Sequence, residues 1–340
     1  MANEHWHLDE FKKSLTSKGK VLPLVQEHLL RSKLEANKLR DSLHLHPSEV
    51  SKRDWCPRAS WYTIKGYEGT PEKLGFQRLN VFAEGHAIHA KWQNWLHEIG
   101  VLYGNWSCQS CGHVWTDLSP KACPSCGSAL KPIYKEVPVK SERYRILGHA
   151  DGQVRTGKEE FLIEIKSVGA GTIRFDNYEL FKDCDGNLDE MWKRVRQPFQ
   201  SHVRQAMLYM YCTGVHKMVF IYEWKPTQDV KEFVVEFQQE LVDPILKSCD
   251  LVLKGLESGL PPMRPLWVTS PEDQVCKWCP HKKTCWRNDD EISSAPQPGL
   301  GDRGIGGPSD SGVQQEVRES EQTAGSDTRP SVQPRRIIRR

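Results

Sequence analysis

The stretch LGHADGQVRTGKEEFLIEIKS, residues 147–167, places three charged side chains in sequence that otherwise has the apolar character of buried β-strands. The three are Asp151, Glu164 and Lys166. Burying a charge is costly unless another group pairs with it or a metal ion binds it. These residues therefore mark either an exposed ion pair or a functional site, and the remaining sequence bears on that choice.

Segments 151–155 and 160–167 are predicted to be the two strands of a hairpin, because the RTGKEE around the turn has a Thr-Gly signal and charges suited to a hairpin tip. Side chains two positions apart share a face of a strand, so Glu164 and Lys166 project to one side while the isoleucines next to them enter the core. Asp151, at the start of the partner strand, can meet both.

Two carboxylates in this arrangement bind a hard divalent ion such as Mg²⁺ or Mn²⁺, and a neighbouring lysine can orient or deprotonate a water molecule and stabilise phosphate charge. This constellation suits phosphodiester hydrolysis. The alternative is a surface ion pair, which is the usual reason for a Glu-x-Lys pattern on an exposed strand face. The hairpin alone does not decide between the two.

Four cysteines form two Cys-x-x-Cys knuckles separated by eleven residues, namely Cys108, Cys111, Cys123 and Cys126. Zn²⁺ prefers four tetrahedral thiolates, and a short segment with little core needs such a metal to fold. We therefore predict a zinc ribbon over residues 104–131. A site closed by four cysteines is structural rather than catalytic.

A second set of cysteines lies toward the C-terminus. Cys276, Cys279 and Cys285 supply three thiolates, and Cys56, in DWCPRASWY, is the best candidate for the fourth. Four thiolates suit either Zn²⁺ or a [4Fe-4S] cluster, and the spacing of the cysteines alone does not distinguish between these two groups. His281 is another candidate for completing a zinc site. Closure through Cys56 would remove the entropy of a loop of more than two hundred residues, so the site is first of all a structural clasp.

The chain is predicted to contain six regions and an α/β or α+β core with a mixed sheet. The regions are a helical N-terminal arm (1–47), a helical first part of the core with Cys56 (48–103), the zinc ribbon (104–131), the main core (132–270), the C-terminal cysteine segment (271–290) and a disordered tail rich in Gly, Pro and Ser (291–340). Predicted helices span about 77–98, 186–213 and 239–259. Predicted strands span 134–140, 144–148, 151–155 and 160–167 as a meander, and then 215–224 and 231–238.

Composition limits the classes of partner. A net charge of +3 over 340 residues is too small for a polybasic nucleic-acid coat, so any DNA contact depends on local patches. No apolar run approaches the roughly 18 residues of a membrane span, and the N-terminus MANEHWHLDEFKK lacks the apolar core of a signal peptide. We expect a soluble, cytoplasmic protein without a membrane partner.

The hairpin motif resembles that of the PD-(D/E)XK nuclease superfamily, and within it the RecB-like branch. In that branch a Gly-x-x-Asp precedes a hydrophobic strand carrying Glu-x-Lys, as Gly148 to Asp151 and Glu164 to Lys166 do here. The resemblance implies a restriction-endonuclease-like α/β core, with a mixed β-sheet flanked by helices, to which the zinc ribbon and the cysteine clasp are added. It also implies a deoxyribonuclease that depends on Mg²⁺ or Mn²⁺.

Two helices carry further motifs of this branch. A glycine followed four residues later by a metal-binding histidine matches Gly85 and His89, with His86 one turn earlier as an alternative. The pattern Gln-x-x-x-Tyr matches Gln205 and Tyr209, which at this spacing share a helix face. Three motifs in the order of the family favour a catalytic site over a surface ion pair.

The resemblance assigns a role to each of these residues. The ligands that it implies for one or two Mg²⁺ or Mn²⁺ ions are the side chains of His89, Asp151 and Glu164 and the carbonyl of Ile165. Lys166 would assist the attacking water, while Gln205 and Tyr209 would face the active site. Glu136, in KEVPVK, would orient the site from a neighbouring strand.

The cysteines extend the resemblance. In the iron–sulfur-containing CRISPR-associated exonucleases and in the AddB nuclease domain, a cysteine in a Cys-Pro-Arg sequence precedes the core and three cysteines follow it, together holding a [4Fe-4S] cluster. Cys56 and the three C-terminal cysteines match that layout, which moves the preference at this site from zinc to iron–sulfur. The zinc ribbon and the N-terminal arm are departures from the pattern.

The substrate implied by the resemblance is single-stranded DNA or a duplex end, in recombination, DNA processing or the trimming of spacer precursors. A helicase, a recombinase or a CRISPR adaptation protein would be the protein partner, and a phage-encoded nuclease of this type would work alone. The rival hypothesis is a non-catalytic zinc and iron–sulfur protein that binds DNA or acts as an adaptor. The complete set of His, Asp, Glu and Lys argues against that rival.

Overall fold

The computed structural model of the chain describes residues 19–70 and 75–287. The beginning of the predicted N-terminal arm and the whole predicted tail, 291–340, lie outside the described residues. Within the arm, α2 (Leu22–Leu39) is helical as predicted. No helix in the described part of the chain is both long enough and apolar enough to cross a lipid bilayer.

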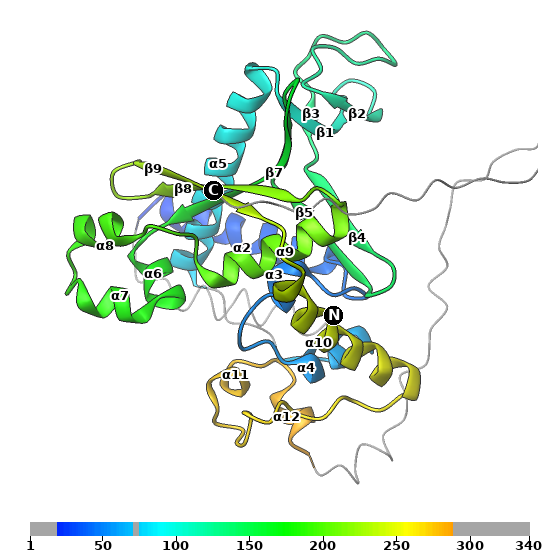
Figure 1. Cartoon of the computed structure of the whole chain (residues 1–340), viewed down its shortest axis with the longest axis vertical. Helices are drawn as coiled ribbons and strands as arrows, with labels where there is room; N and C mark the ends of the chain where they lie inside the picture. The colour runs from blue at the N-terminus through cyan, green and yellow to red at the C-terminus, as the bar shows by residue number, and fades with distance from the viewer. Residues whose placement is uncertain (1–18, 71–74, 288–340) are drawn as a thin grey trace, which may run out of the picture. The chain divides into compact units, whose positions relative to one another are not determined.

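A mixed sheet of seven strands forms the centre of the described part of the chain (Figure 1). The strand order is β2, β1, β6, β7, β8, β9, and β3 pairs with β1. β7 and β8 are parallel, and the other described pairings in this sheet are antiparallel. The strands are β1 (Leu102–Ser107), β2 (Val114–Leu118), β3 (Ile133–Tyr134), β6 (Gly152–Arg155), β7 (Glu160–Val168), β8 (Lys217–Trp224) and β9 (Val230–Glu236).

The predicted four-strand meander is wrong at one point. β4 (Val137–Ser141) and β5 (Ile146–Ala150) pair with each other in a separate two-stranded sheet, and Leu45 adds an isolated parallel bridge to Ile146. β5 ends at Ala150, and the chain joins the central sheet at Gly152 after a single residue, Asp151. The meander is therefore two hairpins, and Asp151 is the residue between them.

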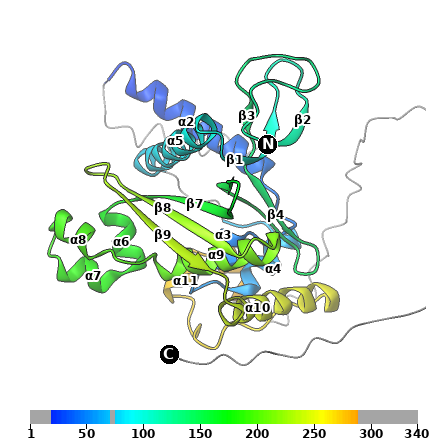
Figure 2. The ribbon, with the colours of Figure 1, turned by 45° about the horizontal axis from the view of Figure 1, so that its top comes forward.

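Helices cover both faces of the sheet (Figure 2). On one face α5 (Phe76–Glu98) packs Ile88 against Ile163, Ile165 and Ile221, and α2 lies along the outer side of α5. On the other face α9 (Gln200–Thr213), α10 (Gln239–Ser258) and α4 (Pro57–Ile64) enclose the largest hydrophobic cluster. The α/β class with a mixed sheet flanked by helices is thus confirmed.

One predicted helix is interrupted. Instead of a single helix over 186–213, the structure has α8 (Leu188–Arg194) and α9, separated by residues 195–199. Pro198 lacks a backbone N–H and clashes within a helix, which accounts for the break. Two helices that were not predicted, α6 (Ala170–Asp176) and α7 (Tyr178–Asp183), group with α8 at one side of the sheet (Figure 1). The remaining short helices are α3 (Pro47–Val50), α11 (Gln274–Lys277) and α12 (Lys282–Cys285).

Candidate functional site

Asp151 occupies the place where the pairing of β6 and β7 ends. The last pair of that ladder is Gly152 with Ile163. Beyond it, the amide of Ile165 donates a hydrogen bond of 2.6 Å to Oδ2 of Asp151. Buried backbone amides need a partner, and here the carboxylate replaces the next strand residue. The ladder opens at this point, so side chains from both faces of the sheet can approach.

Glycines flank Asp151 for steric reasons. A Cβ atom on Gly152 would lie 2.8 Å from Ile163 Cδ1, and a Cβ atom on Gly148 would lie 2.8 Å from Pro47 Cδ. Both distances are shorter than side chains tolerate. Gly148, the glycine of the Gly-x-x-Asp motif, therefore lets β5 pass close to α3. Gly152, the residue after Asp151, lets β6 lie against β7.

Lys166 links the hairpin to α9. Its Nζ donates to Oε1 of Glu164 at 2.5 Å and to Oε1 of Gln205 at 3.3 Å, and Nε2 of Gln205 donates to the hydroxyl of Tyr209 at 2.7 Å. Glu164 is only 3 % exposed, and its second oxygen, Oε2, has no hydrogen-bond partner among the described residues. A buried carboxylate oxygen without a donor is costly, and a cation would remove that cost.

His89 reaches Asp151 from α5. Its Nδ1 lies 3.2 Å from Oδ1 of Asp151, and one ligand atom each from His89, Asp151 and Glu136 lie within 4.8 Å of one another. Imidazole nitrogen with carboxylate oxygens is a donor set that suits Mn²⁺ or Mg²⁺. His86 is exposed, so the geometry favours His89 as the ligand.

Glu136 takes a larger part in this group than the sequence indicated. Its φ of 58° lies in the left-handed region that non-glycine residues rarely adopt. Strain of this kind persists where the surrounding structure imposes it, and often at functional sites. Glu164 lies outside the group of three; one of its oxygens pairs with Lys166 and the other is free. The role of the Ile165 carbonyl stays a prediction.

Negative charge exceeds positive charge in this site. Burial raises the pKa of Glu164 to about 7, the charge of Asp151 adds to that effect, and Lys166 opposes it. Burial also raises the pKa of Glu136, again with a contribution from Asp151. Burial lowers the pKa of Lys166, but the charges of Glu164 and Asp151 outweigh it and raise that pKa overall. The carboxylates would therefore gain from a divalent cation, while the lysine keeps its proton.

A buried carboxylate that the motifs do not include holds α5 in place. Glu223, on β8, is fully buried and accepts hydrogen bonds from Nζ of Lys91 at 2.5 Å and from Nε1 of Trp92 at 2.7 Å. Both donors follow His89 closely on α5, so Glu223 fixes the rotation that turns His89 toward Asp151. The acidic residue in the apolar segment MVFIYEW was the available signal in the sequence.

Replacing Glu223 with Gln should weaken Mn²⁺ binding about 10- to 100-fold, as expected when a group that orients a ligand is removed. Gln keeps one acceptor but loses the ion pair with Lys91. Isothermal titration with Mn²⁺ measures the effect. The matched control is Glu84→Gln, since Glu84 also joins α5 to the end of β8, through an exposed ion pair with Lys225 at 3.0 Å. Unchanged Mn²⁺ affinity in the Glu223 variant would refute the anchoring role.

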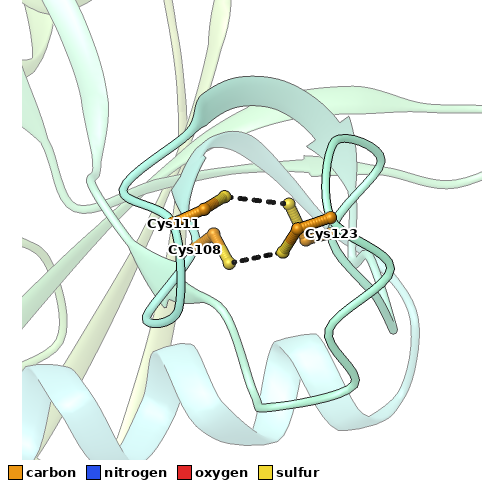
Figure 3. Close-up of side chains that lie close together, drawn as sticks. Cys108, Cys111 and Cys123 are labelled. Carbon is orange, nitrogen blue, oxygen red and sulfur yellow. Dashed lines mark hydrogen bonds between the residues drawn. The ribbon is translucent and has the colours of Figure 1, made fainter.

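The four cysteines of the predicted zinc ribbon lie together. Their sulfurs are within 4.8 Å of one another, with 3.6 Å between Cys108 and Cys126 and 3.8 Å between Cys111 and Cys123 (Figure 3). Four sulfurs placed tetrahedrally at a Zn–S distance of about 2.3 Å are about 3.8 Å apart. The group therefore fits one zinc ion. β1 leads into this cysteine group and also pairs with β6 of the central sheet. The predicted domain boundary between residues 103 and 104 therefore falls inside a strand of that sheet.

Charge also favours a cation among these sulfurs. Amides of Cys111 and Ser110 lower the pKa of Cys108 to about 6, so this thiol ionises readily. At Cys126 the Ser128 amide lowers the pKa, but the thiols of Cys111 and Cys108 outweigh it and raise the pKa to about 12. A second thiolate is thus disfavoured without a positive ion, which a zinc ion would supply.

The second set of cysteines is also assembled, although more loosely. Burial raises the pKa of Cys279 to about 11, and the amide of His281 opposes that rise. The charges of Cys56, Cys285 and Cys276 raise this pKa further, so the four thiols are neighbours. Among the described residues, no three of their sulfurs lie within 4.8 Å of one another. This spacing is wider than one zinc ion requires and leaves room for a polynuclear cluster.

His281 is poorly placed to complete a zinc site with these cysteines. Its Nε2 lies 2.9 Å from the hydroxyl of Thr63, its ring packs on Tyr62, and its Nδ1 is buried without a partner among the described residues. No group of three metal-binding atoms within 4.8 Å in the described chain includes it. Cys56, at the start of α4, remains the better fourth ligand.

Comparisons with known proteins gave structural neighbours alone, since no family model and no curated protein matches the chain. The chain is similar to the solved structure of SSO0001, with 14% sequence identity and a TM-score of 0.40 over 77% of this chain and 96% of that one. It is also similar to an alkaline exonuclease, LHK-Exo, from Laribacter hongkongensis, with 14% identity and a TM-score of 0.36 over 64% and 89% of the two chains. LHK-Exo in complex with dAMP gives 13% and 0.34 over 64% and 90%.

Proposed function

We propose that this protein is a Mg²⁺- or Mn²⁺-dependent DNA exonuclease of the RecB-like branch of the PD-(D/E)XK superfamily. The observation that carries the proposal is the buried Glu164 carboxylate. One of its oxygens pairs with Lys166 and the other has no donor among the described residues, beside the group of His89, Glu136 and Asp151. A stable surface ion pair would leave neither a buried orphan oxygen nor three converging metal ligands.

The residues of the site would have different roles in phosphodiester hydrolysis. His89, Glu136, Asp151 and the free oxygen of Glu164 would hold the metal ion, which supplies Lewis-acid polarisation of the phosphate and an activated water. Lys166, fixed between Glu164 and Gln205, would orient that water and neutralise charge on the scissile phosphate. Its raised pKa favours this role over proton abstraction. Tyr209 acts through Gln205 as a positioning residue.

The proposal includes both cysteine sites. A [4Fe-4S] cluster would be held by Cys56, Cys276, Cys279 and Cys285, and a zinc ion by the four ribbon cysteines. Both would be structural, because neither lies among the carboxylates of the hairpin. The substrate would be single-stranded DNA or a duplex end. A helicase, recombinase or CRISPR adaptation partner and a cytoplasmic location stay predictions.

The test is digestion of DNA labelled at its 5′ or its 3′ end, both single-stranded and duplex, together with a closed circle. We expect degradation of linear DNA with Mn²⁺, none with EDTA, and an intact circle. Tight DNA binding without turnover in any divalent metal would overturn the proposal in favour of a non-catalytic DNA-binding protein. Cleavage of the circle would retain the nuclease and refute the exonuclease.

A further inference from the structure

A cavity of about 340 Å³ lies between α7, the end of α8 and the start of α9. Its polar lining includes Asp176, Asn177, Arg194, Arg196, Gln197 and Gln200. The segment that forms it, residues 169–200, begins directly after β7, which carries Glu164 and Lys166, and ends at the helix that carries Gln205. Both ends of the segment are therefore fixed in the proposed active site.

Positive charge gathers on one wall of this cavity. Arg194 forms an ion pair with Asp183 at 3.2 Å, whereas Arg196 makes no ion pair with any residue in 19–70 or 75–287. Lys231 donates to the carbonyls of Trp192 and Val195 beside them. Burial lowers the pKa of Lys231, the charge of Arg196 lowers it further, and the charge of Asp229 opposes both effects. An anion in the cavity would relieve this repulsion.

The acidic residue among the lining residues, Asp176, is already engaged. Asp176 accepts a hydrogen bond of 2.5 Å from the hydroxyl of Ser201, and its other oxygen lies 3.8 Å from Nε2 of His202. Arg196 is thus the unneutralised charge that faces the cavity.

Two residues that are next in the sequence to lining residues carry exposed aromatic rings. Phe175, at the end of α6, is 91 % exposed, and Tyr178, at the start of α7, is 58 % exposed. These residues flank Asp176 and Asn177, two of the lining residues. Exposed rings beside a positive groove are the arrangement by which proteins bind single-stranded nucleic acid, since unpaired bases stack on the rings while arginines contact phosphates.

We propose that the cavity binds a backbone phosphate of single-stranded DNA through Arg196, and that a base next to that phosphate stacks on Phe175, since the ring of Tyr178 already stacks on Phe181. This subsite deepens the proposed function and rests on it, because the bound strand would lead into the site of Lys166. A duplex is the less suitable ligand, since its bases are already stacked and cannot reach the rings.

The test measures binding by fluorescence anisotropy, without divalent metal, for labelled oligothymidine and for a duplex of equal length. Phe175→Ala should weaken binding of the single strand about tenfold, the loss of one stacking contact. Arg196→Ala should also weaken it and should reduce the slope of log affinity against log salt by about 0.7, one phosphate contact. The slope should not change for Phe175→Ala, and duplex binding should change for neither. Lys193→Ala, an exposed cation that does not line the cavity, is the matched control.

This experiment separates the subsite from the nuclease activity. If either variant binds the single strand like the wild type, or if the Lys193 variant loses as much as the Arg196 variant, the subsite is refuted whether or not the protein cleaves DNA. If the losses appear as expected in a protein that cleaves nothing with Mn²⁺, the subsite stands and the proposed nuclease fails. Binding of oligouridine but not of oligothymidine would overturn the assignment to DNA.

Discussion

Replacing Asp151 with Asn should lower the rate of DNA cleavage by about 10³-fold or more while the protein stays folded. The amide oxygen of Asn can still accept the hydrogen bond from Ile165, so the opening of the ladder between β6 and β7 is preserved. What is lost is the charge that faces His89 and Glu136, and with it most of the attraction for a divalent ion. Single-turnover digestion of labelled DNA over a range of Mn²⁺ concentrations measures the effect.

A matched substitution on the same hairpin controls for general effects of charge removal. Glu159 lies in the turn and pairs with Lys217 at the surface, so Glu159→Gln should leave cleavage unchanged. The Asp151 variant should also require more Mn²⁺ for half-maximal activity. Wild-type cleavage in the Asp151 variant, or equal loss in both variants, would refute the metal site.

Part of this site was predictable because its signal is local. A charge in an apolar strand stands out, and side chains alternate along a strand with a period of two, so Asp151, Glu164 and Lys166 could be identified and placed together. The contacts of Glu223 could not be found in this way. Lys91 and Trp92 lie more than a hundred residues from it, and that pairing exists only once α5 has packed on the sheet.

The fold shows the same division between local and long-range signals. The central strands and α5 follow from alternation and helical periodicity. The break between α8 and α9 at residues 195–199 was not predicted, although Pro198 is a residue that interrupts helices. The apolar residues on either side of the break continue the helical spacing, so the two helices had the pattern of one. The separation of β5 from β6 was not predictable from pairing rules, because consecutive strands usually pair. The single residue between them, Asp151, is too short a connection to turn the chain back, so β6 cannot pair with β5 and pairs with β1 and β7 instead.

Replacing Cys56 with Ser should remove the iron–sulfur cluster and destabilise the whole described core. Cys56 directly precedes α4, and its proposed partners follow α10, so the proposed cluster would close a loop of more than two hundred residues. By the chain-entropy relation, a cross-link of that span is worth about 5 kcal/mol, a large fraction of the stability of a domain. We expect brown wild-type protein after anaerobic purification, and a colourless variant that unfolds at a lower denaturant concentration.

Metal content decides between the two kinds of site. Wild-type protein should contain both iron and zinc, and Cys56→Ser should lose the iron but keep the zinc, because the ribbon sulfurs lie in a separate group. Cys212→Ser, which changes a lone half-buried thiol on α9, should keep both metals. A colourless wild-type protein with two zinc ions would show that the sulfurs of Cys56, Cys276, Cys279 and Cys285 move together around a single zinc ion. Iron retained by the Cys56 variant would exclude Cys56 as a ligand.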